Sequence, residues 1–192
     1  MDWTTGSWTT EPAHVALADD GIHVTAREGS DAWRTTSYGF VHDTEHALLA
    51  PFEQGTAVEV QFRLDFTHQF DQAGVFVRVD AGTWTKAGVE LSDGTESLGA
   101  AVTRDVSDWS LAPVPDWAGR LVTIRGSRSG DALTVRARVD EEAWRLVRVA
   151  PLDADATVQA GPFCCAPSRP GLTVHFTSWR VGDADSALHT DS

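Results

Sequence analysis

Hydrophobic and polar residues alternate along short stretches of this chain, and the spacing that marks long amphipathic helices is missing. In WTKAGVEL (84–91), an extended backbone directs one set of side chains to one side, namely Ala87, Val89 and Leu91. The other side receives Trp84, Lys86, Gly88 and Glu90. The first side is typical of a strand surface that faces a core. The second predicts either a solvated sheet surface or a ligand-binding face.

The same alternation recurs along most of the chain. It predicts further strands at 21–28, 56–66, 73–80, 97–105, 120–128, 132–140, 143–150 and 171–181. Clusters of Gly, Pro, Asp and Ser separate these runs, and three of the spacers are typical of hairpin turns: 81–83, 127–132 and 139–144. About ten to twelve strands with such regular turn signals predict an all-β sandwich or barrel.

No linker or internal repeat divides the chain, so residues 1–192 are expected to form one β-sandwich domain. The polar end, residues 182–192, predicts a frayed tail. The start, MDWTTGSWTTEP, has neither the basic nor the apolar region of a signal peptide, and no apolar run is long enough to span a bilayer. The first dozen residues are either loosely ordered or held against the body by Trp3 and Trp8.

Charge and cysteine content narrow the classes of partner and the location. The formal net charge is −13, with 15 basic and 28 acidic residues, which argues against binding to nucleic acid or to anionic membranes. Cys164 and Cys165 are adjacent, and neighbouring cysteines rarely satisfy disulfide geometry. We expect two small buried residues there, with no redox or metal role, and a reducing, cytoplasmic location.

The polar side of 84–91 is the first candidate site. Lys86 and Glu90 lie four residues apart, about 13 Å along a strand, so they cannot pair directly. By the same alternation, Gln72 lies on the polar face of the preceding strand, and Arg104 reaches Glu90 if its own face is the polar one. With Trp84, these residues form either an ordinary solvated face with cross-strand pairs or a ligand pocket with an aromatic platform.

The stretch TRDVSDWS (103–110) is the second candidate. Its Asp and Ser residues favour turns because they bond their own backbone, so the segment is expected to be a loop. Two interpretations remain open. The tryptophan packs down onto the body, or the loop is a recognition element at the sheet edge with Asp108 and Trp109 facing a ligand.

Motifs for catalysis, cofactors and metals are missing. The chain has no G-x-S-x-G, no phosphate-binding glycine loop and no dinucleotide fingerprint, and no buried-looking strand carries the paired acids of a glycoside hydrolase. His42 and His46 are four residues apart without the rest of a helical zinc motif, and Asp19 and Asp20 offer little for calcium. We therefore predict neither a cofactor nor a metal and assign no catalytic residue.

Six stretches together resemble one family. They occur in the order SDAWRTTSYG, FDQAGVFVRVD, WTKAGVEL, AVTRDVSDWS, AWRLVRVA and GPFCCAPSRPGLTVHF. They are similar to domain-of-unknown-function family 1349, also labelled regulation-of-enolase-like, from about residue 11 to residue 181. The resemblance implies a concanavalin A-like jelly-roll sandwich of two antiparallel sheets, whose concave sheet often binds or cleaves glycans. The resemblance implies that the positions of this chain on the concave face are Gln72, Trp84, Lys86, Glu90, Arg104, Asp108 and Trp109.

Three functional hypotheses follow. The first is a binding module for a saccharide or sugar-like metabolite, with Trp84 and Trp109 stacking on the sugar and the polar residues bonding its hydroxyls. The second is a carbohydrate-active enzyme with Glu90 as acid or base and Asp108 as second carboxylate, although the E-x-D-x-x-E strand of the superfamily's glucanases is absent. The third is a regulatory partner of a metabolic enzyme. The sequence does not fix the oligomeric state.

Overall fold

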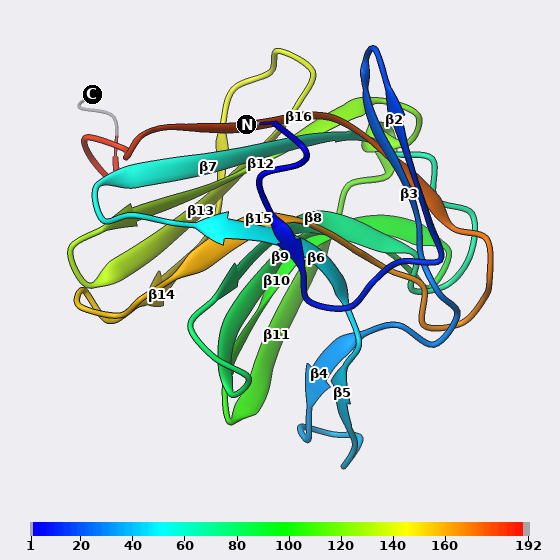
Figure 1. Ribbon diagram of the computed structural model, residues 1–192, viewed down its shortest axis with the longest axis horizontal. Helices are drawn as coiled ribbons and strands as arrows, with labels where there is room; N and C mark the ends of the chain where they lie inside the picture. Colours follow the sequence, from blue (N-terminus) through cyan, green and yellow to red (C-terminus); the bar gives the residue numbers. More distant parts are fainter. Residues whose placement is uncertain (1, 190–192) are drawn as a thin grey trace.

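Two large antiparallel sheets make up most of the computed structural model, which describes residues 2–189 (Figure 1). The first sheet has seven strands in the spatial order β1 (Ser7–Trp8), β6 (His46–Pro51), β15 (Gln159–Cys165), β8 (Gln72–Arg78), β9 (Thr83–Ser92), β10 (Thr95–Arg104) and β11 (Val106–Pro113). The second also has seven, in the order β14 (Arg145–Pro151), β13 (Ala132–Val139), β12 (Leu121–Ser129), β7 (Thr56–Arg63), β16 (Thr173–Asp183), β3 (Gly21–Thr25) and β2 (His14–Ala18).

A small hairpin, β4 (Ala32–Arg34) and β5 (Val41–Asp43), projects from the first sheet at the bottom of Figure 1. A 3₁₀ turn, η1 (Pro115–Trp117), follows β11. Within residues 2–189, no helix is long and apolar enough to cross a membrane. The predicted all-β sandwich of two antiparallel sheets is confirmed.

The main core lies between the inner faces of the two sheets. Alternation explains it, because every second side chain of each strand points inward. Ala87, Val89 and Leu91 of β9 join this core, as the sequence predicts, together with Val75 and Val77 of β8. The three predicted hairpins also form, since the strands on either side of each spacer pair with one another.

A second, smaller core covers part of the outer face of the first sheet. Its buried residues are Ala32, Ala47, Leu49, Phe76, Trp84, Ala101, Phe163 and Cys165. The hairpin of β4 and β5 is held against this face because the Ser107 hydroxyl of β11 accepts a hydrogen bond from the Arg34 backbone N–H at 3.0 Å.

The predicted strand count is too low. Sixteen strands form within the described residues, against the ten to twelve expected. The additional ones include short strands such as β1, β4 and β5, of two or three residues, where alternation cannot be recognised. The segment predicted as a loop at 103–110 instead continues β10 and forms β11, after a turn in which Asp105 adopts a positive φ of 61°.

Both ends of the described chain are tied to the sandwich. Trp8 lies in β1 and pairs with Leu48, and the rings of Trp3 and Trp179 lie 6.2 Å apart. At the other end, Asp185 forms ion pairs with Arg125 and Arg136, so the predicted frayed tail is wrong for this part of 182–189. Residues 190–192 of that predicted tail lie outside the described residues.

Candidate functional site

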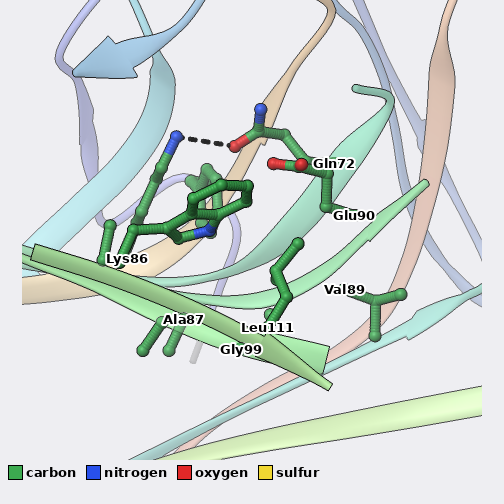
Figure 2. Close-up of a pocket in the computed structure, with 12 residues that line it drawn as sticks. Gln72, Lys86, Ala87, Val89, Glu90, Gly99 and Leu111 are labelled. Carbon is green, nitrogen blue, oxygen red and sulfur yellow. Dashed lines mark hydrogen bonds between the residues drawn. The ribbon is translucent and has the colours of Figure 1, made fainter. Parts of the chain in front are cut away.

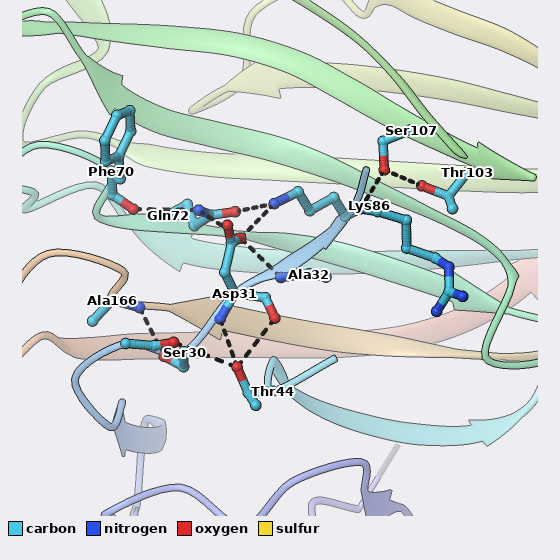
Figure 3. Close-up of polar contacts among 12 residues, drawn as sticks. Ser30, Asp31, Ala32, Thr44, Phe70, Gln72, Lys86, Thr103, Ser107 and Ala166 are labelled. Carbon is cyan, nitrogen blue, oxygen red and sulfur yellow. Dashed lines mark hydrogen bonds and ion pairs between the residues drawn. The ribbon is translucent and has the colours of Figure 1, made fainter. Parts of the chain in front are cut away.

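A buried lysine forms the centre of the candidate site. Lys86 points to the outer face of β9 and retains only 7% of its exposed surface. Its ammonium group donates hydrogen bonds to Asp31 Oδ1 and to Gln72 Oε1, each at 2.9 Å (Figure 3). Gln72 reaches it from β8, where it lies opposite Glu90 in the register of the sheet. Two strands of the sheet and the segment before β4 therefore meet at one ammonium group.

Asp31 is held in place by contacts at both ends of the β4–β5 hairpin. Its Oδ1 accepts the backbone N–H of Ala32 at 2.8 Å, and its own N–H donates to the hydroxyl of Thr44 at 3.1 Å. Burial alone would lower the pKa of Lys86, but the nearby charge of Asp31, its hydrogen bond and the charge of Glu90 outweigh burial and raise that pKa. The lysine is therefore cationic at neutral pH, and the Lys86–Asp31 contact is a true ion pair.

Glu90 lies beside this pair without a comparable partner. Its Oε1 atom is buried and accepts no hydrogen bond within the described chain. Burial is the main cause that raises the pKa of Glu90 to about 7; the charge of Lys86 lowers it, and those of Asp31 and Asp93 raise it. Figure 2 shows the Glu90 carboxyl next to the Gln72 amide, with the Lys86 ammonium group on the far side of that amide. This carboxyl can exchange a proton close to neutral pH.

A cavity of about 240 Å³ opens above these polar groups. Ten residues line it: Asp31, Trp33, Tyr38, Phe40, Phe70, Gln72, Lys86, Glu90, Trp109 and Pro167. Five of them are aromatic and come from three separate segments of the chain, so the cavity has a polar floor and an aromatic rim. This combination of apolar walls with a few fixed polar groups is typical of small-molecule sites.

The aromatic rim is built by ring-to-ring contacts. Tyr38 and Phe40 stack with their centroids 5.3 Å apart, and Trp33 meets Tyr38 edge-on at 5.7 Å and Trp109 edge-on at 6.0 Å. Trp33 is buried, whereas Trp109 keeps 39% of its surface exposed. Trp33 thus anchors the rim, and the outer rings remain partly exposed.

Four of the seven predicted site residues line the cavity, namely Gln72, Lys86, Glu90 and Trp109. Trp84 does not. It points to the same face as Lys86, but its ring is 4% exposed and stacks on Phe76 at 5.3 Å within the smaller core. The structure therefore gives Trp84 a packing role and leaves it no face for a ligand.

Arg104 is also absent from the cavity. In the pairing of β9 with β10, Arg104 lies opposite Thr83 whereas Glu90 lies opposite Ser97. The two residues are thus about seven positions apart along the strands, or roughly 23 Å. Arg104 instead donates to the backbone oxygen of Pro151 at 2.6 Å. The predicted contact with Glu90 is wrong, because the register was not available from the sequence.

Asp108 and Trp109 were predicted to face one ligand from a loop. They are neighbours on strand β11, so their side chains point to opposite faces. Trp109 faces the cavity, whereas Asp108 is turned away and forms an ion pair with Arg148 at 2.9 Å. Asp108 therefore cannot be the second carboxylate of the site, and within the cavity lining that position belongs to Asp31.

Six cavity residues were not predicted as site residues: Asp31, Trp33, Tyr38, Phe40, Phe70 and Pro167. The stretch SDAWRTTSYGF does carry a signal, since it combines an acid with three kinds of aromatic ring beside turn residues. It gives no indication of which distant strand it covers. Phe70 is even harder to predict from the sequence, because it lies in the loop before β8, where it adopts a positive φ of 68°.

His46 and the two cysteines are buried side chains that serve the fold. His46 is fully buried, with Nε2 accepting the Arg27 backbone N–H at 3.0 Å and Nδ1 bonded to the Thr10 oxygen at 2.9 Å. Cys164 and Cys165 are free and buried, as expected, and burial raises the pKa of the Cys164 thiol to about 12. None of the three lines the cavity.

Comparison with known proteins places the chain in a family. Residues 8–184 match the family described as "Protein of unknown function (DUF1349)". The chain is 36% identical over 187 residues to Regulation of enolase protein 1 of Saccharomyces cerevisiae, covering 96% of this chain and 93% of that protein. The crystal structure of a functionally unknown protein from Saccharomyces cerevisiae superposes with a TM-score of 0.90 at 32% identity, over 97% of this chain and 100% of the other.

More distant structures share the fold. A xylan β-1,4-xylosidase from Bacillus halodurans C-125 matches with a TM-score of 0.66 at 13% identity, over 88% of this chain but only 38% of that one. The carbohydrate binding module CBM66 from Bacillus subtilis matches with a TM-score of 0.56 at 15% identity, over 92% and 96% of the two chains. These likenesses show a concanavalin A-like jelly roll, and the family match and the close relative show that the chain belongs to the DUF1349 family.

Proposed function

We propose that this protein binds a saccharide or a sugar-like metabolite in the cavity on the outer face of the first sheet. One observation carries the proposal: exposed aromatic rings surround a floor of polar groups that are already fixed in position. A pyranose or furanose ring has apolar C–H faces and a polar edge of hydroxyls. A cavity with an aromatic rim and a polar floor is complementary to both surfaces.

The floor offers both donors and acceptors to such a ligand. The Lys86 ammonium group has three N–H donors and uses two of them on Asp31 and Gln72. The free Oε1 of Glu90 accepts a bond from a ligand hydroxyl when ionised, and the carboxyl can donate one when protonated. Each sugar hydroxyl is itself a donor and an acceptor, so it can satisfy Glu90 without bringing a charge into the cavity.

The architecture agrees with this proposal but does not carry it. A solved structure that is itself a carbohydrate binding module shares the jelly roll, yet one fold serves many functions. The support for the proposal therefore comes from the side chains that line the cavity. Trp109 lines the cavity and offers a stacking surface, since 39% of it is exposed while its ring packs at right angles to that of Trp33.

The experiment is a thermal-unfolding screen of the purified protein against mono- and oligosaccharides and sugar phosphates, followed by calorimetric titration of any hit. A ligand at 100 times its Kd stabilises the native state by about 2.7 kcal/mol, which raises Tm by several degrees in a domain of this size. Trp109→Ala is expected to abolish the shift. The control is Asp108→Asn, which changes the neighbouring side chain on the opposite face and should keep it.

Two results would overturn the proposal. One is a complete screen with no shift in the wild-type protein. The other is a sugar that binds the Trp109→Ala variant as tightly as it binds the wild type, since binding would then take place elsewhere on the surface.

A second candidate function is glycoside hydrolysis, and one observation favours it. Two carboxyls line the same cavity in different electrostatic environments: burial raises the pKa of Glu90 to about 7, whereas Asp31 is paired with the Lys86 cation. Carboxyl pairs whose environments differ in this way are typical of an acid and its partner. Release of reducing sugar from the hit oligosaccharide, lost in Glu90→Gln while binding persists, would establish catalysis. Binding without turnover in the wild type would exclude it for that ligand.

A third candidate is regulation of a metabolic enzyme through direct contact. The relative of 36% identity is named for regulation of enolase, and that name is the observation in its favour. Size-exclusion chromatography of the purified protein with purified enolase is the test, with Trp109→Ala and Asp108→Asn used to locate the contact. Separate elution at concentrations of tens of micromolar would exclude a stable complex.

A further inference from the structure

A separate cluster of metal-binding side chains lies on the outer face of the second sheet. His23 of β3 and His175 of β16 are directly opposite each other in the antiparallel register. Their neighbours Ile22, Val24 and Phe176 point into the main core, so the two imidazoles point away from it. Asp20 stands at the turn between β2 and β3, next to the same pair of strands.

The donor atoms of these three side chains are close together. One ligand atom from each of Asp20, His23 and His175 lies within 4.8 Å of the other two. His175 Nε2 and Asp20 Oδ1 are 3.5 Å apart, and the two imidazole rings stack with centroids 4.2 Å apart and an interplanar angle of 13°. Metal–ligand bonds of 2.0–2.2 Å in a tetrahedron place neighbouring donors about 3.4 Å apart. The His175–Asp20 distance already fits, whereas the two stacked imidazoles have to turn before both can bind one ion.

The backbone holds the third ligand in position. Gly21 has a φ of 142°, and a Cβ atom there would lie 2.0 Å from the Phe176 carbonyl oxygen, so only glycine lets the turn approach β16 so closely. This approach brings Asp20 beside His175. On the next pair of outward residues, the hydroxyls of Thr25 and Thr173 are 2.9 Å apart, which fixes the same strand pairing from the other side.

His175 also has an unused nitrogen. Its Nε2 atom is buried and makes no hydrogen bond within the described residues, although the Asp20 carboxylate lies close by. A buried polar atom without a partner is costly, and a metal ion would satisfy it. Asp20 is 73% exposed at its side chain, so it is free to move toward an ion.

We propose that Asp20, His23 and His175 form a binding site for a divalent transition-metal ion such as Zn²⁺. Two imidazoles and one carboxylate suit zinc, copper or nickel, whereas calcium and magnesium prefer sites built from oxygen atoms alone. Three protein ligands leave one tetrahedral position for water. Binding draws the two rings out of their parallel stack, because the ion must lie near the plane of each ring. It also cross-links the β2–β3 turn to β16.

This site is independent of the saccharide cavity and was not expected from the sequence. In the sequence, Asp20 stands out only beside Asp19, as a weak candidate for calcium. Its two imidazole partners come from strands about 150 positions apart along the chain, and only the pairing of β3 with β16 brings them together.

The test is calorimetric titration of Zn²⁺ into the full chain after treatment with a chelator. We expect one ion per chain at micromolar affinity or tighter, and a tetrahedral cobalt absorption spectrum when Co²⁺ replaces Zn²⁺. His23→Gln and His175→Gln are each expected to weaken binding at least about tenfold, since even the loss of a second-shell partner costs ten- to a hundredfold. Asp20→Asn should weaken it too, and the exposed position of Asp20 makes this variant the least disturbing to the fold.

The matched control is His14→Gln, which removes an exposed histidine from the adjacent strand β2 and should leave the affinity unchanged. Circular dichroism of each metal-free variant verifies that it is folded. The proposal is overturned if the wild type binds no Zn²⁺ below about 100 µM. It is equally overturned if folded His23→Gln, His175→Gln and Asp20→Asn bind Zn²⁺ as the wild type does.

Discussion

Two clusters of charged side chains lie on the outer faces of the two sheets, and they differ in how their charges are satisfied. On the second sheet, Arg125 contacts Glu59 at 2.7 Å and Asp185 at 2.8 Å, and Arg136 contacts the same Asp185 at 3.0 Å. We call these four residues the Arg125 cluster. On the first sheet, the Lys86 cluster contains Lys86, Asp31, Gln72 and Glu90, and the Oε1 atom of Glu90 has no partner within the described chain.

The difference separates a structural network from a candidate site. In the Arg125 cluster every charged side chain faces an opposite charge, and the ion pairs tie the end of the chain to the sheet. In the Lys86 cluster, the buried Oε1 atom of Glu90 has no hydrogen-bond partner within the described chain. Glu90 also lines a cavity that aromatic rings surround. Charged residues on a sheet face are therefore weak evidence of function. A buried, unpaired polar atom facing a cavity is much stronger evidence.

The largest expected effect is that of Lys86→Ala. Removing the ammonium group leaves Asp31 without its cation and increases the repulsion between Asp31 and Glu90. Breaking a buried ion pair in this way costs about 3–5 kcal/mol of unfolding free energy. Chemical denaturation at pH 7.5 measures it. A cost below about 1 kcal/mol would mean that water screens the cluster, and the contrast with the Arg125 cluster would disappear.

Glu90→Gln is expected to stabilise the protein, and only at higher pH. The pKa of Glu90 is raised from 4.5 to about 7 in the fold, chiefly by burial, so the native state prefers the protonated carboxyl. The stability that the protonated Glu90 carboxyl contributes is complete below about pH 4.5 and is lost as the pH rises through 7. The glutamine variant should therefore exceed the wild type by about 2–3 kcal/mol at pH 8 and match it near pH 4.5.

Unfolding free energies of both proteins, taken across that pH range, provide the measurement. Asp108→Asn is the control, because Asp108 is exposed and paired with Arg148, and its difference from the wild type should stay small at every pH. If Glu90→Gln and the wild type differ by a constant amount from pH 4.5 to pH 8, Glu90 has an ordinary environment and loses its place in the proposed site.

The smallest expected effect belongs to Arg136→Ala in the Arg125 cluster. Asp185 keeps its contact with Arg125 after the change, so no buried charge is left alone. A cost of about 1 kcal/mol is expected, decreasing as salt is added. Denaturation in 0.05 M and 0.5 M NaCl tests this. A loss of unfolding free energy as large as that of Lys86→Ala would show that removing one charge is equally costly in both clusters.

The sequence predicts the scaffold well because the pattern that specifies it is local. Ala87, Val89 and Leu91 alternate with polar partners, and such alternation identifies a strand and its inner face without knowledge of any neighbour. The resemblance to a known family narrows the predicted all-β sandwich or barrel to a jelly-roll fold. The edge strand β11 was missed because Asp105, Ser107 and Asp108 have turn-forming side chains, and pairing with β10 overrides that preference.

The site could be predicted only in part because it is assembled by long-range contacts. Lys86 and Glu90 were found because they share one strand face. Asp31, which pairs with Lys86, comes from a segment 55 positions away, and its contact depends on how the β4–β5 hairpin docks. Trp84 and Trp109 look equivalent in the sequence, yet packing around Phe76 buries the first and leaves the second in the cavity lining.

The central claim is that a sugar occupies the cavity between Trp109 and the Lys86 cluster. The most direct measurement is an NMR titration that follows the indole N–H signals of the eight tryptophans during addition of the saccharide hit, with assignment by single Trp→Phe variants. The account predicts large shifts for Trp33 and Trp109 and almost none for Trp144 or Trp179, which lie outside the cavity lining. Shifts confined to Trp144 and Trp179, with Trp33 and Trp109 unmoved, would contradict it.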